Sequence, residues 1–199
     1  MSVNTYLSDG ERAVLEGAKI GIAGAGGLGS NCAMHLVRAG VRRLVVADFD
    51  VVCESNLNRQ FFFRDQLGMK KVDALRENLL RIEPSLEIET VDIRLDAGSV
   101  RSLFADCSVV VEAFDTVESK SMILGAFVGT GRKLVTASGI AGWGRSNAIR
   151  VRRLGADIIA VGDGETTVGE GAAPVSPRVG IAAAMQANAV VSILLKKEL

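Results

Sequence analysis

The run Gly24-Ala25-Gly26-Gly27-Leu28-Gly29 constrains the fold of this chain more than any other feature of its sequence. It follows a short apolar stretch at residues 19–23 that is typical of a buried strand, and a helical pattern at 33–40 follows it. Glycines at such a junction permit a tight turn and a close approach of the backbone to a phosphate, and the helix N-terminus supplies free N–H groups. A tight turn without a ligand is the alternative. The strand–turn–helix context favours a nucleotide site at Gly24, Gly26, Gly27 and Gly29.

Strand-like and helix-like patterns alternate along the rest of the chain. They predict strands at 44–47, 86–93, 109–113 and 134–137, and helices at 72–82, 100–104 and 119–128. Residues 146–153 and 158–161 are predicted to form an antiparallel extension, residues 162–180 a long crossover loop, and residues 179–195 a final helix. This alternation predicts an α/β fold, a doubly wound, Rossmann-like and mostly parallel sheet.

Length and composition limit the classes of protein to consider. The 199 residues fit a single ATP-binding domain, residues 1–199, and a content of 48% hydrophobic and 23% charged residues is typical of a globular chain. Because 23 basic and 23 acidic residues cancel, we expect neither nucleic acid nor a membrane as a partner. Neither a signal sequence nor a membrane span is predicted, which favours a cytoplasmic location.

The cysteines indicate neither disulfides nor a metal site. Cys32, Cys53 and Cys107 are an odd number at wide spacing, and no Cys-x-x-Cys pair is present, so we expect no zinc. We expect them to be buried as small apolar side chains, although Cys53 lies near the proposed site. The single histidine, His35, falls within the first helix and is expected to be part of the packing.

Two acidic residues, Asp48 and Asp50, come at the end of the second predicted strand. Asp48 lies about 20 residues after the glycine run, where a carboxylate accepts hydrogen bonds from the ribose hydroxyls of a nucleotide. The glycine motif alone favours a dinucleotide, so it cannot separate a dehydrogenase from an enzyme that uses ATP. A nicotinamide-dependent oxidoreductase therefore remains open at this point.

A dense polar segment then separates these alternatives. The loop that leaves the second strand is predicted to carry Ser55, Asn56, Asn58, Arg59 and Gln60. Arg59 can bind phosphate oxygens in a fork, and Lys71, at the start of the next helix, can place a point charge on the same anion. Taken singly, such residues are usually solvated loop side chains. Together they favour a triphosphate, and therefore ATP.

Asp115 and Thr116 follow the strand at 109–113, so they too are predicted at the carboxyl edge of the sheet. An acid there can hold magnesium beside a triphosphate. The same two residues can instead cap the helix that follows. Their spacing favours neither role over the other.

The order of several motifs resembles the ThiF/MoeB family, relatives of ubiquitin-activating enzymes. The motifs are GAGGLGS, DFD, SNLNRQ, LGMKKVDA and FDTVESK, with APVSPRVGIAAAMQANAV near the end of the chain. The resemblance implies a nucleotidyltransferase that uses ATP and magnesium to adenylate the C-terminal Gly-Gly carboxylate of a small ubiquitin-like sulfur-carrier protein. It also implies that Asp48 binds the ribose and that Asp115 holds the magnesium. Arg59 and Lys71 would bind the phosphates and, with Asp115, be the catalytic residues.

The chain departs from this family's pattern in three respects. It lacks the two Cys-x-x-Cys pairs that hold a structural zinc in many relatives, and residues 162–180 lack the cysteine with which many relatives bind their carrier covalently. It also starts without the segment that delivers an arginine to the partner subunit's site, because Arg12 is the only arginine before the glycine run. In its small size and its lack of a zinc motif, the chain resembles the short ThiF-like proteins of thiamine thiazole synthesis. This resemblance implies that the carrier is ThiS.

Other functions remain open beside this one. A related ATP-dependent enzyme that acts on tRNA or a small molecule, of the threonylcarbamoyladenosine dehydratase kind, has a similar loop. A NAD-dependent oxidoreductase and a non-catalytic binding scaffold are the other two. The resemblance also predicts a homodimer, although core packing explains apolar segments such as residues 61–63 equally well. We further expect residues 162–180 to cover the tail of the carrier.

Overall fold

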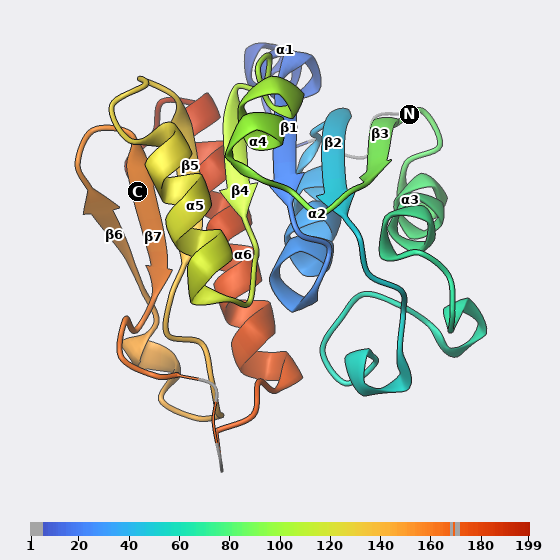
Figure 1. The fold of residues 1–199 in the computed structure, drawn as a ribbon. Coiled ribbons are helices and arrows are strands. Elements are labelled where there is room, and N and C mark those ends of the chain that lie inside the picture. Colours follow the sequence, from blue (N-terminus) through green and yellow to red (C-terminus); the bar gives the residue numbers. More distant parts are fainter. Residues whose placement is uncertain (1–5, 168, 170–171) are drawn as a thin grey trace.

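The chain, seen here as a computed structural model, is described over residues 6–167, 169 and 172–199. Within these ranges the strands are β1 (Lys19–Ala23), β2 (Arg43–Asp48), β3 (Glu87–Asp92), β4 (Val109–Glu112), β5 (Lys133–Ala137), β6 (Arg150–Leu154) and β7 (Ile158–Gly162). They form one sheet in the order β3-β2-β1-β4-β5-β7-β6 (Figure 1). Neighbouring strands are parallel except for the pair β6 and β7. The predicted mostly parallel sheet with an antiparallel extension is confirmed.

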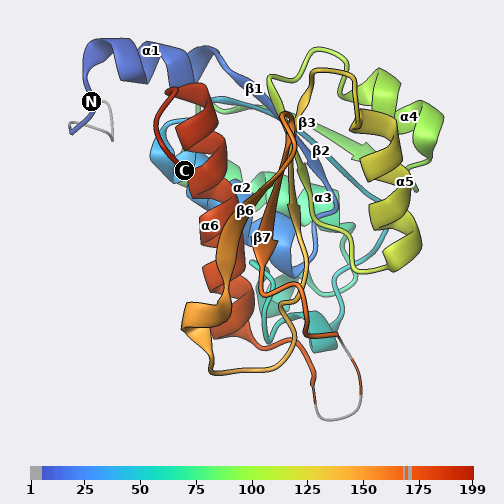
Figure 2. The same ribbon diagram turned by 90° about the vertical axis from the view of Figure 1, so that its left-hand side faces the viewer.

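Helices cover both faces of this sheet. They are α1 (Asp9–Gly17), α2 (Gly27–Ala39), α3 (Lys71–Ile82), α4 (Ala97–Leu103), α5 (Val117–Phe127) and α6 (Ser176–Leu194), with short 3-10 turns η1 (Glu54–Asn56), η2 (Arg64–Gln66) and η3 (Ser146–Ala148). Helices α2, α3 and α6 pack on one face, and α4 and α5 on the other (Figure 2). The chain therefore changes face between β1 and β4, and ligands of such sheets bind outside the carboxyl ends of the strands at that point.

The two faces of the sheet build two apolar clusters. Ile20 and Ile22 of β1 belong to the cluster under α2, α3 and α6, whereas Ala23 belongs to the cluster under α4 and α5. Gly21 lies between Ile20 and Ile22 in β1, and a Cβ on it would lie 2.5 Å from the ring of Phe104. Gly21 thus makes room for one of the largest fully buried side chains of the protein.

The structure corrects three details of the prediction. Helix α1 was not predicted, although Ser8 and Glu11 form a capping box at its start. Residues 146–148 form η3 instead of the beginning of a strand. The final helix begins at Ser176, three residues before the predicted start at 179, because Pro177 fits the first turn of a helix, where no N–H donor is needed. The crossover loop therefore ends at Val175, and its residues 168, 170 and 171 lie outside the described residues.

Helix α6 is the element in the described part of the chain that is long and apolar enough to cross a membrane by length and composition. Half of its apolar window, 50%, is buried inside the protein. It packs against α2 and against β5 and β7. These contacts are those of a core helix in a globular fold.

Candidate functional site

The glycine turn between β1 and α2 is closely packed at the carboxyl edge of the sheet. Gly24 has a φ of 101°, and a Cβ there would lie 2.9 Å from the carbonyl oxygen of Ala113. A Cβ on Gly29 would lie only 1.8 Å from the carbonyl oxygen of Gly24. Gly26 is the N-cap of α2, so no side chain caps the first N–H groups of the helix. This uncapped helix start is the arrangement that binds phosphate groups.

Asp48, the last residue of β2, is hydrogen-bonded to this turn. Its Oδ2 accepts a hydrogen bond from the backbone N–H of Ala25 at 2.6 Å, and its Oδ1 accepts one from the N–H of Asp50 at 2.8 Å. Each carboxylate oxygen can accept a further hydrogen bond. The half-buried Asp48 can therefore bind ribose hydroxyls without releasing the turn.

Lys71 lies at the first position of α3 with its side chain only 7% exposed. Its Nζ is 2.7 Å from Oδ2 of Asp50, and its backbone N–H donates to the carbonyl oxygen of the same residue at 2.9 Å. Asp50 itself is half-exposed. Because an ammonium group has three donors, Nζ of Lys71 can donate to a further acceptor while it remains bound to Asp50.

Arg59 lies against the glycine turn. A Cβ on Gly27 would be 3.5 Å from Cγ of Arg59. Its Nη1 donates to the carbonyl oxygen of Ser55 at 3.0 Å and to Oδ1 of Asn58 at 2.8 Å. In the described part of the chain, Nη2 of Arg59 has no acceptor, so half of the guanidinium fork is available to an anion.

Two side chains of α2 hold this loop against the glycine turn. Nδ2 of Asn31 donates to the carbonyl oxygens of Gly27, at 2.7 Å, and of Arg59, at 2.9 Å. Oγ of Ser30 donates to the carbonyl oxygen of Gly26 at 2.7 Å and accepts from the N–H of Phe61 at 3.0 Å. Sequence reasoning missed both residues. The signal was a polar pair inside an otherwise apolar helical pattern.

The remaining polar residues of the loop have more local roles. Oδ1 of Asn56 accepts from the N–H of Cys53 at 3.1 Å, which closes η1. The side chain of Gln60 is buried beside Gly26, and its Oε1 has no hydrogen-bond partner among the described residues. The structure thus gives Asn56 a turn-closing contact and leaves Gln60 with an acceptor for water or a ligand.

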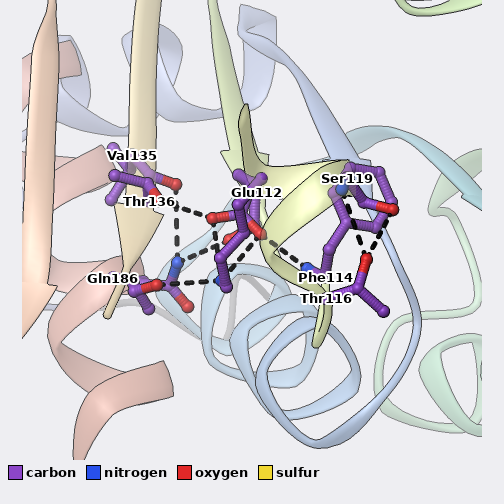
Figure 3. A network of polar contacts seen from close by, with 9 residues as sticks. Glu112, Phe114, Thr116, Ser119, Val135, Thr136 and Gln186 are labelled. Atoms are coloured by element: carbon purple, nitrogen blue, oxygen red, sulfur yellow. Dashed lines mark hydrogen bonds and ion pairs between the residues drawn. The ribbon is translucent and has the colours of Figure 1, made fainter. Parts of the chain in front are cut away.

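At the end of β4 the capping role predicted for Asp115 or Thr116 is taken by Thr116. Thr116 is the N-cap of α5, and its Oγ1 accepts from the N–H of Ser119 at 3.2 Å (Figure 3). Asp115 precedes the cap and is exposed. The carboxylate of Asp115 therefore remains available, whereas the hydroxyl of Thr116 is used within the fold.

The donor set fits a metal–nucleotide complex better than a resident metal centre. Among the described residues, no group of three or more His, Cys, Asp or Glu side chains could hold a metal ion. Magnesium, however, is usually bound by one or two carboxylates together with substrate phosphates and water. One exposed carboxylate at Asp115 matches that pattern.

A stacked pair next to Asp48 was not predicted. The guanidinium carbon of Arg94 lies 4.0 Å from the centroid of the Phe49 ring. Phe49 directly follows Asp48, but Arg94 comes from the segment after β3, so only the pairing of β2 with β3 brings the two together. The pair adds a flat, positively charged surface next to Asp48.

Of the three cysteines predicted to be buried, only Cys32 is fully buried, and His35 is partly buried. Cys32 is buried, and burial raises the pKa of its thiol. Cys107 is half-buried, and burial, aided by the charge of Asp106, raises its pKa to about 11. Cys53 is exposed, so the expectation that it is buried is wrong. Burial, with a smaller effect of Arg38, lowers the pKa of His35.

A surface cavity of about 350 Å³ lies at the other end of α2, between its last turn and that of α3. Arg38, Arg42 and Arg81 line it, and Arg42 forms an ion pair with Glu83 at 2.9 Å. Cations at the C-terminal ends of two helices are stabilised by the helix dipoles. These arginines therefore need no ligand to explain them.

A model of the ThiF family matches residues 3–199. The chain is 38% identical over 110 residues to the molybdopterin-synthase adenylyltransferase of Salmonella typhimurium, covering 55% of this chain and 44% of that protein. It is 31% identical over 168 residues to the adenylyltransferase and sulfurtransferase UBA4 of Candida glabrata, covering 78% of this chain and 39% of that protein. The chain thus spans less than half the length of these curated relatives.

Among solved structures, the E. coli tRNA N6-threonylcarbamoyladenosine dehydratase in complex with AMP aligns with a TM-score of 0.89. The alignment covers 98% of this chain and 93% of that chain, at 21% identity. At this identity the likeness shows a shared fold. That fold is the doubly wound sheet described above.

Proposed function

Because the chain belongs to the ThiF family, we propose that it is a nucleotidyltransferase that joins the AMP of ATP to the C-terminal carboxylate of a small sulfur-carrier protein. The observation that supports this most is the placement of two cations around one glycine turn. Arg59 lies against Gly27, and Lys71 is bound to Asp50, whose N–H is held by the same carboxylate that braces Ala25. A triphosphate on the turn would be near two positive charges, which come from different segments.

The chemistry needs no nucleophile from the protein. A C-terminal carboxylate has a pKa of about 3.3–3.7 and is ionised at neutral pH. One of its oxygens attacks the α-phosphorus of ATP, a new C–O–P linkage forms, and the bond to the β-phosphate oxygen breaks to release pyrophosphate. The protein must position the two anions and offset the charge that gathers on the leaving group. Arg59 and Lys71 are placed for that role.

Asp115 is the residue that would hold magnesium in this site. The ion, when bound with the nucleotide, neutralises phosphate charge and orients the pyrophosphate as a leaving group. Asp48 would fix the ribose at the other end of the nucleotide, and the uncapped start of α2 would hold a phosphate between them. Each of these residues comes from a different loop at the same edge of the sheet.

The finer assignment extends this proposal. The carrier would be ubiquitin-like with a Gly-Gly tail, ThiS-like, and used in thiamine thiazole synthesis. The protein would be a cytoplasmic homodimer, and the crossover loop between β7 and α6 would cover the tail. Size measurement by light scattering tests the dimer, and a strict monomer contradicts it. Deletion within the loop tests whether the loop covers the tail of the carrier. An unchanged adenylation rate and an unchanged carrier affinity would contradict that role.

A second candidate is an ATP-dependent enzyme that acts on tRNA. The fold likeness to a tRNA-modifying enzyme extends over nearly the full length of both chains, unlike the matches to the longer curated relatives. Such an enzyme would use the same nucleotide site. ATP-dependent turnover of modified tRNA in the absence of any carrier protein would favour this candidate.

The deciding experiment is ATP–pyrophosphate exchange with magnesium and a carrier protein ending in Gly-Gly. The matched substrate control is the same carrier without its last glycine. The matched protein pair is Asp115→Ala and Asp65→Ala, because Asp65 is an exposed aspartate in η2. We expect exchange only with the intact tail, lost in Asp115→Ala and kept in Asp65→Ala. Absence of exchange with several such carriers, while ATP still binds, would contradict the proposal.

A further inference from the structure

A buried ion pair lies beneath the turn that carries Asp115. Glu112, the last residue of β4, is 0% exposed, and its two carboxylate oxygens lie 2.9 and 3.1 Å from Nζ of Lys120 on α5. Thr136 of β5 donates its hydroxyl to the same carboxylate. A buried ion pair gives the fold little net stability compared with apolar residues of similar size. Stability alone is therefore a weak reason for Glu112 and Lys120.

The carboxylate of Glu112 also fixes the backbone next to Asp115. Its Oε1 accepts a hydrogen bond from the N–H of Phe114 at 2.7 Å (Figure 3). On the other side of Asp115, Thr116 is held by its capping bond with Ser119. The backbone is thus anchored immediately before and immediately after Asp115, while the side chain between the anchors is exposed.

The same network is tied to the rest of the sheet. Nζ of Lys120 donates to the carbonyl oxygen of Ala137, at the end of β5, at 2.9 Å. Nε2 of Gln186 on α6 donates to the carbonyl oxygen of Glu112 at 2.9 Å, and to that of Val135 at 3.4 Å (Figure 3). Hydrogen bonds therefore connect the turn to two strands, β4 and β5, and to two helices, α5 and α6.

We propose that Glu112 is a positioning residue. Its carboxylate accepts a hydrogen bond from the N–H of Phe114, and this bond orients the Asp115 carboxylate toward the magnesium–nucleotide complex. This inference rests on the proposed ATP site. Lys120 keeps the carboxylate of Glu112 in place, and Gln186 holds the backbone of the same residue. The bond to Phe114 is the contact that acts on Asp115.

Two double variants isolate this bond. Both carry Lys120→Met, so neither contains the ion pair. Glu112→Gln keeps a side-chain oxygen for the N–H of Phe114, whereas Glu112→Leu has a similar size and no acceptor. The readout is the affinity of a non-hydrolysable ATP analogue, measured by calorimetry with magnesium and with EDTA. The ratio of the two affinities reports the metal-dependent part of binding and requires no turnover.

We expect Glu112→Gln with Lys120→Met to keep the wild-type ratio within about twofold, and Glu112→Leu with Lys120→Met to lower it about fivefold or more, the effect of one lost hydrogen bond. Affinity in EDTA should change in neither. Equal ratios in the two variants, both folded by circular dichroism, would overturn the role of Glu112. A wild type that binds the analogue with no magnesium effect would overturn the metal role of Asp115 as well, which belongs to the proposed function.

A measurement on the unaltered protein covers the case in which the leucine variant does not fold. The N–H of Phe114 should exchange with deuterium as slowly as the N–H groups within β4, because its acceptor is fully buried. Exchange as fast as that of exposed loop amides would show that the bond is not maintained. That result overturns the inference without any substitution.

Discussion

The side-chain amide of Asn31 donates a hydrogen bond to the carbonyl oxygen of Arg59, 2.9 Å away, and so joins α2 to the loop that follows β2. The same nitrogen donates to Gly27 at 2.7 Å. One side chain thus ties the glycine turn to the backbone of Arg59. We therefore expect Asn31→Ala to weaken ATP binding about fivefold, the value of about one hydrogen bond. Asn188→Ala, at an exposed position of α6, is the control; equal affinities in the two variants would contradict the expectation.

The glycine turn leaves no space for a side chain at position 29. Because a Cβ there would lie 1.8 Å from the carbonyl oxygen of Gly24, the backbone of the turn must move in Gly29→Ala. We expect a loss of about 2 kcal/mol or more in the free energy of unfolding by urea, together with weaker ATP binding. Gly10→Ala in α1 is the control, because a Cβ there meets nothing within 4 Å, and its stability should not fall. A stable Gly29→Ala that binds ATP normally would refute the proposed close packing.

Two neighbouring lysines differ in burial and partner. Lys71 is 7% exposed and bound to Asp50, whereas Lys70 is half-exposed and paired with Asp92 at 2.6 Å. We expect Lys71→Met to slow ATP–pyrophosphate exchange about 100-fold, because it removes a preorganised charge from the phosphates. Lys70→Met should change the rate little, since exposed ion pairs contribute little. Equal rates in the two variants would remove Lys71 from the site.

The buried pair of Asp163 and Arg178 predicts sensitivity to acid. Burial alone would raise the pKa of Asp163, but hydrogen bonds from Thr166 and the charge of Arg178 outweigh it and hold the pKa below the ordinary 3.8. The stability that this carboxylate contributes is complete above its unfolded pKa and is lost as the pH falls through the folded value. Urea unfolding should therefore show a smaller loss of stability below pH 3.8 in Asp163→Asn than in the wild type. Parallel curves for the two proteins would contradict the assignment.

The three cysteines should react with a thiol reagent at different rates. Cys53 is exposed and should react first in the native protein. Cys107 should react slowly near neutral pH, because burial raises its pKa to about 11 and the thiolate is the reactive form. Cys32 is buried and should react only after unfolding. Mass spectrometry of labelled peptides gives the order directly, and early labelling of Cys32 would show that α2 opens in the native state.

Much of the fold could be predicted from the sequence because its parallel strands are buried on both faces. Such strands appear as short apolar runs, and helical periodicity between them is equally visible. The bounds of β1 were predicted without error, and those of α3 within one residue. Helix α1 was missed because its sequence has few apolar residues and only Leu15 is buried in it. Its signal was the capping box, not a periodic pattern.

The site was predictable only where one loop carries its own chemistry. Gly24, Asp48 and Arg59 could be assigned to the carboxyl edge because each follows a strand or lies in a loop that does. Asn31 and Glu112 could not be assigned in this way. Asn31 bonds to Arg59, 28 residues away in sequence, and the carboxylate of Glu112 is held by Thr136, 24 residues away. Pairing between distant elements decides such contacts, and a single sequence does not show it.

The strand order divides the sheet into two ends. The loops that would hold the nucleotide follow β1, β2 and β4, whereas β5, β7 and β6 form the other end of the sheet. Helix α6 and the side chains around Glu112 join the two ends. The loops after β5 and β7 can therefore be exchanged between relatives, in evolution or in a chimaera. The loops after β1, β2 and β4 would keep their arrangement. Under the proposed function, such an exchange would alter the contacts with the carrier protein from one side of the domain.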